Sequence, residues 1–259
     1  MGKIIVLVKD ILDFEEIKFW SSNISANYKG KKTKINDLDK NALQAALDLK
    51  DEHDFEVITL SVGDNLTKTA LLEVLAMGAD EAYLVNDESM RSADQYTISK
   101  VLQAAIEKME NYDLIICGEL SLDTMASQIG VRLATLLDIP LLPYVKELKI
   151  VGDTVEALKE YEDYDEKVRS PIPSIVSVIR EINEPSIPSL IKIMRAKRKP
   201  LTEWTLQDLN VGEVKNRVDI IDLETPLIER RRVTIDGETE EEIVSKLIQY
   251  LKKEGVAGV

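Results

Sequence analysis

Short apolar runs alternate with longer amphipathic segments through the first 140 residues of the chain. The apolar runs are residues 4–8, 55–62, 81–85 and 113–117. The amphipathic segments are residues 41–50, 66–77, 93–109 and 124–137. Gly78 and Pro140 follow two of these segments, where helices commonly end. Because strands separated by helices pair in parallel through right-handed crossovers, the alternation predicts an α/β fold with a doubly wound, mostly parallel sheet.

The pattern changes after Pro140. Residues 145–150 and 154–161 flank Val151-Gly152-Asp153, which predicts an antiparallel hairpin added to the sheet. Residues 174–179 are rich in β-branched side chains and lie between prolines, so we expect one more strand there.

The last part of the chain looks less like a hydrophobic core. We expect short β-like pieces there, such as residues 218–221, and a terminal helix near residues 240–252. A tail of this kind buries little surface alone, which predicts an extended C-terminal arm lying against something else. The expected organisation is an α/β domain over residues 1–194 and an arm over residues 195–259.

The amino-acid composition excludes several classes of binding and catalytic site. The chain has 33 Lys and Arg against 47 Asp and Glu, a net charge of −14, which argues against a general nucleic-acid binder. Its single cysteine, Cys117, and single histidine, His53, exclude an internal disulfide, a multi-histidine metal site and a histidine-based triad within one chain. We expect no metal site, a structural Cys117 and a surface His53. A bound cofactor must therefore carry any redox or group-transfer chemistry.

No apolar run approaches the roughly 18 residues of a membrane-spanning helix. The start of the chain carries too short an apolar stretch and too early an acid for a signal peptide. These features predict a cytoplasmic protein, or one in an organelle matrix.

Two predicted strands end in glycine, at Val62-Gly63-Asp64 and Cys117-Gly118-Glu119. Residues 118–130 then lead into a predicted helix whose start is rich in small and hydroxyl side chains, an arrangement that suits a phosphate. The alternative is that Ser121, Asp123 and Thr124 only cap that helix. The sequence contains neither a GxGxxG fingerprint nor a GxxxxGK[ST] loop.

A basic run, Met194-Arg195-Ala196-Lys197-Arg198-Lys199, follows an apolar stripe of Ile187, Leu190, Ile191 and Met194. An apolar anchor beside basic residues suits docking on an acidic partner. The stripe fits an ordinary core equally well.

Over residues 3–201 the sequence resembles the β subunits of electron transfer flavoproteins. Several segments carry the resemblance together through their order and spacing. They are Val6-Leu7-Val8-Lys9, Asn36-Asp37-Leu38-Asp39, Ser61-Val62-Gly63, Leu75-Ala76-Met77-Gly78-Ala79-Asp80, Asp123…Gln128-Ile129-Gly130 and Asn183-Glu184-Pro185. The resemblance implies a Rossmann-like, adenine-nucleotide-binding fold. It also implies a heterodimer with an α subunit that carries FAD, against which the C-terminal arm packs.

In that family the β subunit holds either AMP or a second FAD. The residues that match its nucleotide contacts are Leu7, Asn36, Asp37, Leu38, Asp39, Val62, Gly118, Ser121, Asp123, Thr124, Ser127, Gln128, Ile129 and Gly130. The loop that docks on partner dehydrogenases maps onto residues 186–195. The expected docking residues are Leu190, Ile191, Met194, Arg195, Lys197 and Arg198.

The segment containing Asp94 and Thr97 resembles the family branch that holds FAD in the β subunit, and the alternative is that Asp94 only caps a helix. Asp37 departs from the family, since a proline is usual there. We favour FAD over AMP in this chain. The implied function is relaying electrons between dehydrogenases or NADH and a quinone- or ferredoxin-linked acceptor.

Two other classes stay open from the residues alone. One is an adenine-nucleotide-binding α/β hydrolase or nucleotidyl-transfer enzyme, although the chain lacks a P-loop and the usual His or Cys catalytic pairs. The other is a non-catalytic nucleotide-sensing module. Turnover of ATP would favour the first, and stable nucleotide binding without redox activity would favour the second.

Overall fold

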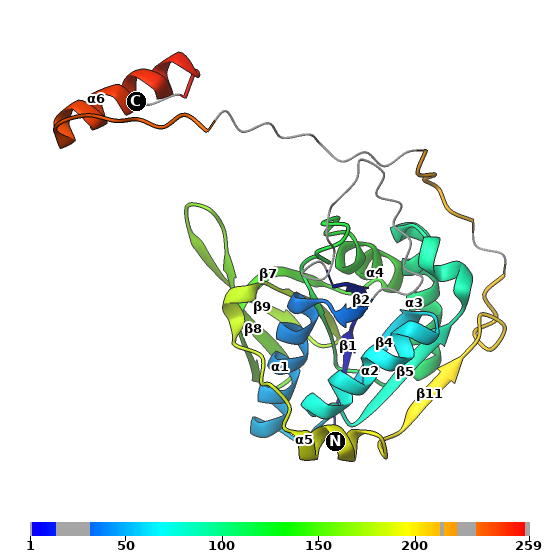
Figure 1. Ribbon diagram of the computed structural model, residues 1–259. Coiled ribbons are helices and arrows are strands. Elements are labelled where there is room, and N and C mark those ends of the chain that lie inside the picture. Colours follow the sequence, from blue (N-terminus) through cyan, green and yellow to red (C-terminus); the bar gives the residue numbers. More distant parts are fainter. Residues whose placement is uncertain (1, 14–31, 213–214, 222–231, 257–259) are drawn as a thin grey trace. The chain divides into compact units, whose positions relative to one another are not determined.

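The computed structural model describes residues 2–13, 32–212, 215–221 and 232–256 (Figure 1). It divides into two compact units. The first unit continues to Ile221, and the second contains the C-terminal helix. The expected division near residue 195 stays a prediction, and residues 201–204 of the expected arm pair with the central sheet.

The first unit is built on a nine-stranded sheet in the order β11-β5-β4-β1-β6-β10-β7-β8-β9. Its parallel strands are β1 (Gly2–Leu7), β4 (Phe55–Gly63), β5 (Glu81–Asn86), β6 (Leu114–Gly118), β7 (Leu141–Val151), β10 (Ser174–Val178) and β11 (Leu201–Trp204). Two antiparallel strands, β8 (Thr154–Glu160) and β9 (Asp165–Pro171), extend it beyond β7. The predicted α/β class, the mostly parallel sheet and the hairpin are confirmed.

Helices cover both faces of this sheet (Figure 1). They are α1 (Asp37–Glu52), α2 (Asn65–Met77), α3 (Gln95–Met109) and α4 (Ile129–Leu137). Ile4 packs in one core with Leu43 of α1, whereas its neighbour Ile5 packs in the other with Leu102 of α3 and Leu133 of α4. Because successive strand residues face opposite sides, the apolar residues 4–7 of β1 are buried on both faces of the sheet.

The helix expected over residues 124–137 begins later, at Ile129. Residues 122–124 form a turn, and Met125 and Ser127 have φ angles of 47° and 51°. Those left-handed angles cannot continue a right-handed helix, so the segment before Ile129 is a loop. Gln128, and not Ser121 or Asp123, stands at the N-cap of α4, and it makes no side-chain capping bond.

Several elements were not expected. A small antiparallel sheet pairs β2 (Asp10–Leu12) with β3 (Thr33–Ile35), and β9 and β11 are additional strands of the main sheet. Short helices are the 3-10 turns η2 (Glu88–Ser92) and η3 (Arg180–Ile182), and α5 (Leu190–Ala196). Residues 218–221, expected to be β-like, form no strand.

The sole cysteine and sole histidine lie as expected. Cys117 is buried near the end of β6, and burial raises the pKa of its thiol far above the usual value. His53 is exposed at the end of α1. In the described part of the chain, no helix is long and apolar enough to cross a membrane.

The second unit contains α6 (Glu240–Lys253), which confirms the predicted terminal helix. Its N-cap, Thr239, accepts a hydrogen bond from the Glu242 N–H (3.2 Å). Ile243, Val244, Leu247 and Ile248 are exposed at helical spacing, which gives α6 an apolar stripe within its own unit.

Candidate functional site

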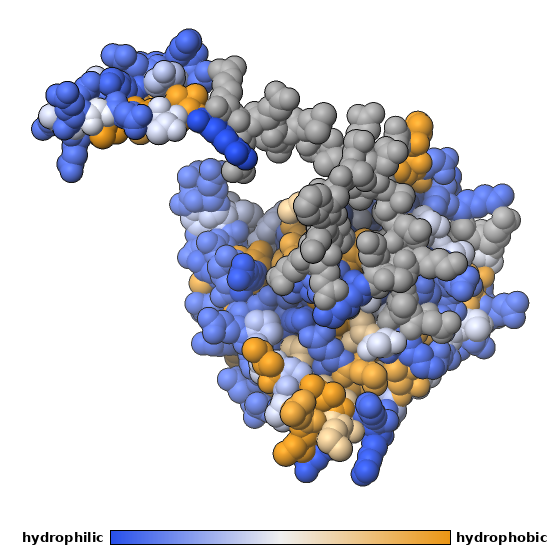
Figure 2. Space-filling model, viewed as in Figure 1, coloured by the Kyte–Doolittle hydropathy of each residue, from blue (hydrophilic) through white to orange (hydrophobic). Residues whose placement is uncertain are grey.

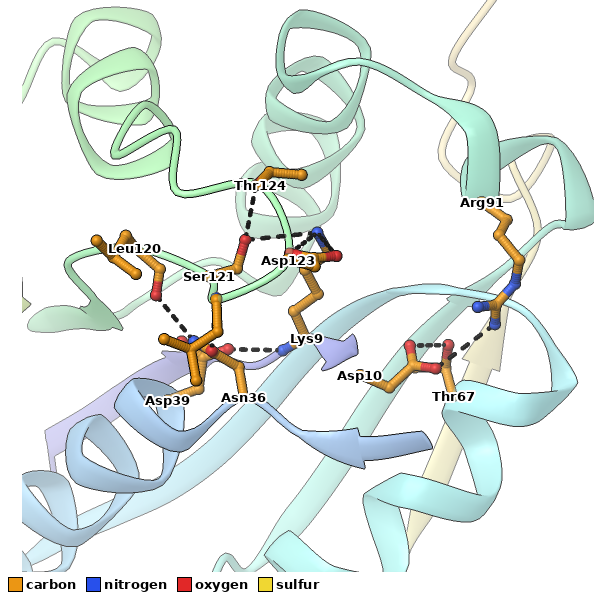
Figure 3. A network of polar contacts seen from close by, with 11 residues as sticks. Lys9, Asp10, Asn36, Asp39, Thr67, Arg91, Leu120, Ser121, Asp123 and Thr124 are labelled. Atoms are coloured by element: carbon orange, nitrogen blue, oxygen red, sulfur yellow. Dashed lines mark hydrogen bonds and ion pairs between the residues drawn. The ribbon is translucent and has the colours of Figure 1, made fainter. Parts of the chain in front are cut away.

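The candidate site lies at the carboxyl ends of β1 and β6. The chain proceeds from β1 toward β4 and β5 on one side, and from β6 toward β10 and β7 on the other. Open α/β sheets bind ligands outside the strand ends at such a reversal of strand order. Figure 3 shows the polar contacts that connect the loops at this edge.

Asn36 joins the start of α1 to the loop that follows β6 (Figure 3). Its Nδ2 donates to the Leu120 carbonyl (2.9 Å), and its Oδ1 accepts from the Leu122 N–H (3.1 Å). Asn36 is the N-cap residue of α1 but makes no capping bond, because the loop engages both its side-chain polar atoms. This fully buried residue therefore fixes the position of the loop.

Asp39 is a buried carboxylate between the two strand ends. The Lys9 N–H donates to its Oδ2 (2.8 Å), and the Gly118 N–H also donates to it. Burial raises the pKa of Asp39 to about 7, although hydrogen bonds from Asn36, Lys9 and Gly118 oppose the shift. The Asp39 carboxyl group thus connects the backbone just after β1 to the end of β6, the two neighbouring strands at which the strand order reverses.

Gly118 must be glycine at this point. A Cβ atom here would lie 2.6 Å from Asp39 Oδ1 and 2.8 Å from Leu38 Cβ. The backbone of Gly118 therefore lies against two other predicted residues, Leu38 and Asp39, more closely than a side chain on residue 118 would allow.

Lys9 is a residue of this site that the sequence prediction did not include. Its ammonium lies 2.7 and 2.9 Å from the two carboxylate oxygens of Asp123 and 3.5 Å from Ser121 Oγ (Figure 3). The hydroxyls of Ser121 and Thr124 are 2.9 Å apart. Ser121, Asp123 and Thr124 thus organise the loop and do not cap α4. The signal for Lys9 was its place directly after an apolar strand, in Val6-Leu7-Val8-Lys9.

The first turn of α4 offers hydrogen-bond donors. The first regular helical bond runs from the Arg132 N–H to the Gln128 carbonyl (2.9 Å), so the N–H groups of Ile129, Gly130 and Val131 precede the helical ladder. The Gln128 side chain accepts from the Arg132 guanidinium (2.8 and 3.0 Å). These donors stand at the positive end of the helix dipole, which suits an anionic group.

A small pocket opens beside this helix start. Ser127, Gly130 and Val131 line one side, and Pro143 and Tyr144 of β7 line another. The pocket lies at the same carboxyl edge as the Asn36 and Asp39 contacts, because β6 pairs with β10 and β10 with β7.

Of the other predicted nucleotide residues, Leu7 is buried at the end of β1 and Val62 is half-buried near the end of β4. Asp37 pairs with Lys34 (3.2 Å) in the first turn of α1 and is half-exposed.

A second polar cluster lies at the ends of β4 and β5 (Figure 3). Thr67 Oγ1 donates to Asp10 (2.6 Å), and Arg91 Nε donates to Asp64 (2.7 Å). A terminal nitrogen of the same guanidinium, Arg91 Nη2, lies 3.5 Å from Asp10 Oδ2. This cluster joins β2, α2 and η2. No local sequence pattern predicts this cluster, because its members are far apart in the chain.

Asp94 caps α3, as the alternative interpretation had it: its Oδ1 accepts from the Thr97 N–H (2.8 Å). Its Oδ2 accepts from the N–H groups of Arg217 (2.5 Å) and Val218 (3.0 Å). Although partial burial opposes ionisation, these bonds outweigh it and hold the pKa of Asp94 below its usual value. Thr97 is almost fully buried.

The residues predicted to dock on a partner lie on the surface. Ile187, Leu190, Ile191 and Met194 are 94, 80, 63 and 72% exposed, so the core interpretation of this stripe is wrong. Figure 2 shows hydrophobic residues gathered at the lower end of the view, where Figure 1 places α5. The basic residues Arg195, Lys197 and Arg198 are also exposed.

The chain matches one family model and several known proteins over most of its length. The family model described as "Electron transfer flavoprotein domain" matches residues 27–209. "Electron transfer flavoprotein subunit beta" of Thermoanaerobacterium thermosaccharolyticum is 33% identical over 98% of this chain and 99% of its own length. The protein of the same name from Clostridium acetobutylicum is 35% identical over 81% of each chain. "Caffeyl-CoA reductase-Etf complex subunit CarD" of Acetobacterium woodii is 30% identical over 98% of this chain and 99% of its own.

Proposed function

This chain belongs to the electron transfer flavoprotein family, among its β subunits, and we propose that it binds an adenine nucleotide at the β1–β6 edge of its sheet. The proposed assembly is a cytoplasmic heterodimer with an α subunit that carries FAD. It relays electrons between dehydrogenases or NADH and a quinone- or ferredoxin-linked acceptor. The bound flavin supplies the electron-accepting ring, and this chain binds and orients the nucleotide.

The observation that carries the nucleotide proposal is the donor set at the start of α4. Three N–H groups precede the helical ladder at the strand-order reversal, next to a loop held by Asn36 and by Lys9. A phosphate accepts hydrogen bonds and carries negative charge, so it complements these donors and the helix dipole. The residues present therefore fit the phosphate end of AMP or FAD.

We propose FAD as the nucleotide in this chain, with AMP as the alternative. The Asp94 contacts favour the alternative, because both carboxylate oxygens already accept backbone N–H groups from this chain. A flavin that used Asp94 would require residues 216–218 to move away from it.

The exposed stripe on α5 supports a docking role. Apolar side chains beside basic ones suit an acidic partner surface with an apolar pocket, such as we propose for a dehydrogenase. We also propose that the apolar stripe of α6 packs against the α subunit, because among residues 232–256, the part of this unit that the structure describes, no side chain is fully buried and the stripe stays exposed.

Nucleotide identification tests this proposal. The chain is co-expressed with its α-type partner, and the nucleotides released from the purified heterodimer are identified and counted. Two FAD per heterodimer are expected, and one FAD with one AMP would support the alternative. A heterodimer without flavin would overturn the electron-transfer proposal, and ATP turnover by this chain would favour the hydrolase class.

A further inference from the structure

A bulge in β7 opens the sheet next to β10. Leu142 pairs with Val176 and Val145 pairs with Val178, so Pro143 and Tyr144 together face the single residue Ser177. Tyr144 has a left-handed φ of 58°, which bends the strand. Bulges of this kind often lie beside binding sites, where they redirect side chains.

Ser177 contributes a hydroxyl to the pocket that this bulge creates. The residue is 6% exposed and lines the pocket. Within the described part of the chain, its hydroxyl makes no hydrogen bond. A hydroxyl at a pocket wall that has no protein partner is free to donate to a ligand atom that accepts a hydrogen bond.

The first turn of α4 forms the opposite side of the pocket. A Cβ atom on Gly130 would lie 3.8 Å from Ser177 Cβ, so the start of the nine-residue helix α4 lies next to β10. Ser127 has a φ of 51°, and left-handed residues before a helix direct successive N–H groups toward one point. The N–H groups and the Ser177 hydroxyl therefore border the same space.

One charged side chain, Glu119, also lines this pocket. Its main-chain N–H donates to the Val178 carbonyl (2.9 Å), which fixes the backbone, and the residue is half-buried. A carboxylate repels a phosphate, so the E119Q variant is expected to bind a phosphate-bearing ligand more tightly.

We propose that the Ser177 hydroxyl donates a hydrogen bond to the phosphate of the nucleotide held at the start of α4. This inference rests on the proposed function and adds to it a phosphate-binding residue on β10, 47 positions after Gly130 in the sequence. Hydrogen bonds to charged groups are stronger than those between neutral groups, so the hydroxyl acts on the phosphate and not on the adenosine part.

The test compares AMP with adenosine on the nucleotide-free heterodimer by calorimetry. In S177A, the Kd for AMP is expected to rise about tenfold while the Kd for adenosine is unchanged. S177T keeps the hydroxyl and is expected to retain the AMP affinity. The matched control is S174A, because Ser174 lies on the same strand, is fully buried and also has an unpartnered hydroxyl, but stands at the other end of β10.

Unchanged AMP affinity in S177A, or an equal loss for AMP and adenosine, would overturn the role of Ser177 and leave the proposed function standing. A wild-type heterodimer that binds neither AMP nor FAD would instead remove both proposals. Melting temperatures of S177A and S174A show whether either change disturbs the fold.

Discussion

The Lys9 ammonium lies 2.7 Å from the Asp123 carboxylate and connects the end of β1 to the loop after β6. The Asp123 side chain is 10% exposed and that of Lys9 is 44% exposed. Lys9 acts at two points, because its main-chain N–H also binds Asp39. The loop that carries several predicted nucleotide contacts is therefore held by Lys9, two residues after the end of β1.

Charge reversal tests the Lys9–Asp123 pair. K9E and D123K are each expected to weaken nucleotide binding several-fold, because like charges would push the loop away from β1. The double variant K9E/D123K restores an attraction and should recover most of the affinity. Nucleotide titrations at low and high salt measure the coupling, and additive losses in the double variant would contradict it.

Asp39 should make stability depend on pH. Its pKa is about 7 in the folded chain and 3.8 as an ordinary carboxyl, so between these values the folded state keeps a proton that the unfolded state has lost. The free energy of unfolding should therefore fall as pH rises from about 4 to 7, by up to about 1.4 kcal/mol per pH unit from this group. Above pH 7 this contribution levels off.

Urea unfolding of D39N and wild type across this range measures the effect. Asparagine does not titrate, so D39N should show a smaller downward slope whatever its offset in stability. D37N is the matched control, because Asp37 is the half-exposed carboxyl two residues earlier on α1. Parallel slopes for D39N and wild type would contradict the buried titration.

The regular elements at the centre of the fold could be predicted from the sequence because each carries a local pattern. Ile4, Ile5 and Val6 are all buried, as their continuous apolar run indicated. The start of α4 could not be found in this way, since small and hydroxyl residues suit a helix start and a loop equally well. The left-handed φ angles of Met125 and Ser127 show that the segment before Ile129 is a loop.

A residue at a strand end carries a local signal in the sequence, whereas a contact between distant residues carries none. Lys9 adjoins a strand end and was still missed, because its partner Asp123 is 114 positions away. Gly118 follows an apolar strand and was found, whereas the contact of Arg91 with Asp64 spans 27 positions and that of Asp94 with Arg217 spans 123. Strand β11 was missed because four residues with partial exposure carry no clear alternation.

Gly118→Ala is expected to destabilise the fold by about 1–3 kcal/mol, because the new Cβ would clash with Asp39 and Leu38. The backbone carbonyl carbon of Leu38, 3.0 Å from that Cβ, cannot turn aside as a flexible side chain could. Gly212→Ala is the control, since a Cβ there meets no atom within 4 Å. Equal urea midpoints for the two variants would contradict the close approach.

Leu190→Glu is expected to slow electron transfer with a partner dehydrogenase at least tenfold without changing the melting temperature. Leu190 is 80% exposed, so the fold does not depend on it. Val151→Glu is the control, because Val151 is 52% exposed at the end of β7, remote in sequence from the stripe. Flavin reduction followed by absorbance gives the rates, and equal rates for both variants would place docking elsewhere.

Asp94 should protect the Arg217–Val218 peptide bond from trypsin. Its carboxylate accepts hydrogen bonds from the N–H groups of Arg217 and Val218. The Arg217 guanidinium lies 5.1 Å from the ring centre of Tyr96. Asp94→Ala removes these acceptors and the α3 cap, so we expect faster cleavage after Arg217 and a loss of about 1 kcal/mol in stability. Asp208→Ala is the control, because Asp208 accepts from Thr205 (2.7 Å) and makes no such contact with residues 216–218.

The pKa of Asp94 lies below its ordinary value, so the protection is present above pH 3.8 and is lost as pH falls through the lower, folded-state pKa. Cleavage after Arg217 at the wild-type rate in Asp94→Ala would show that this carboxylate does not hold the segment.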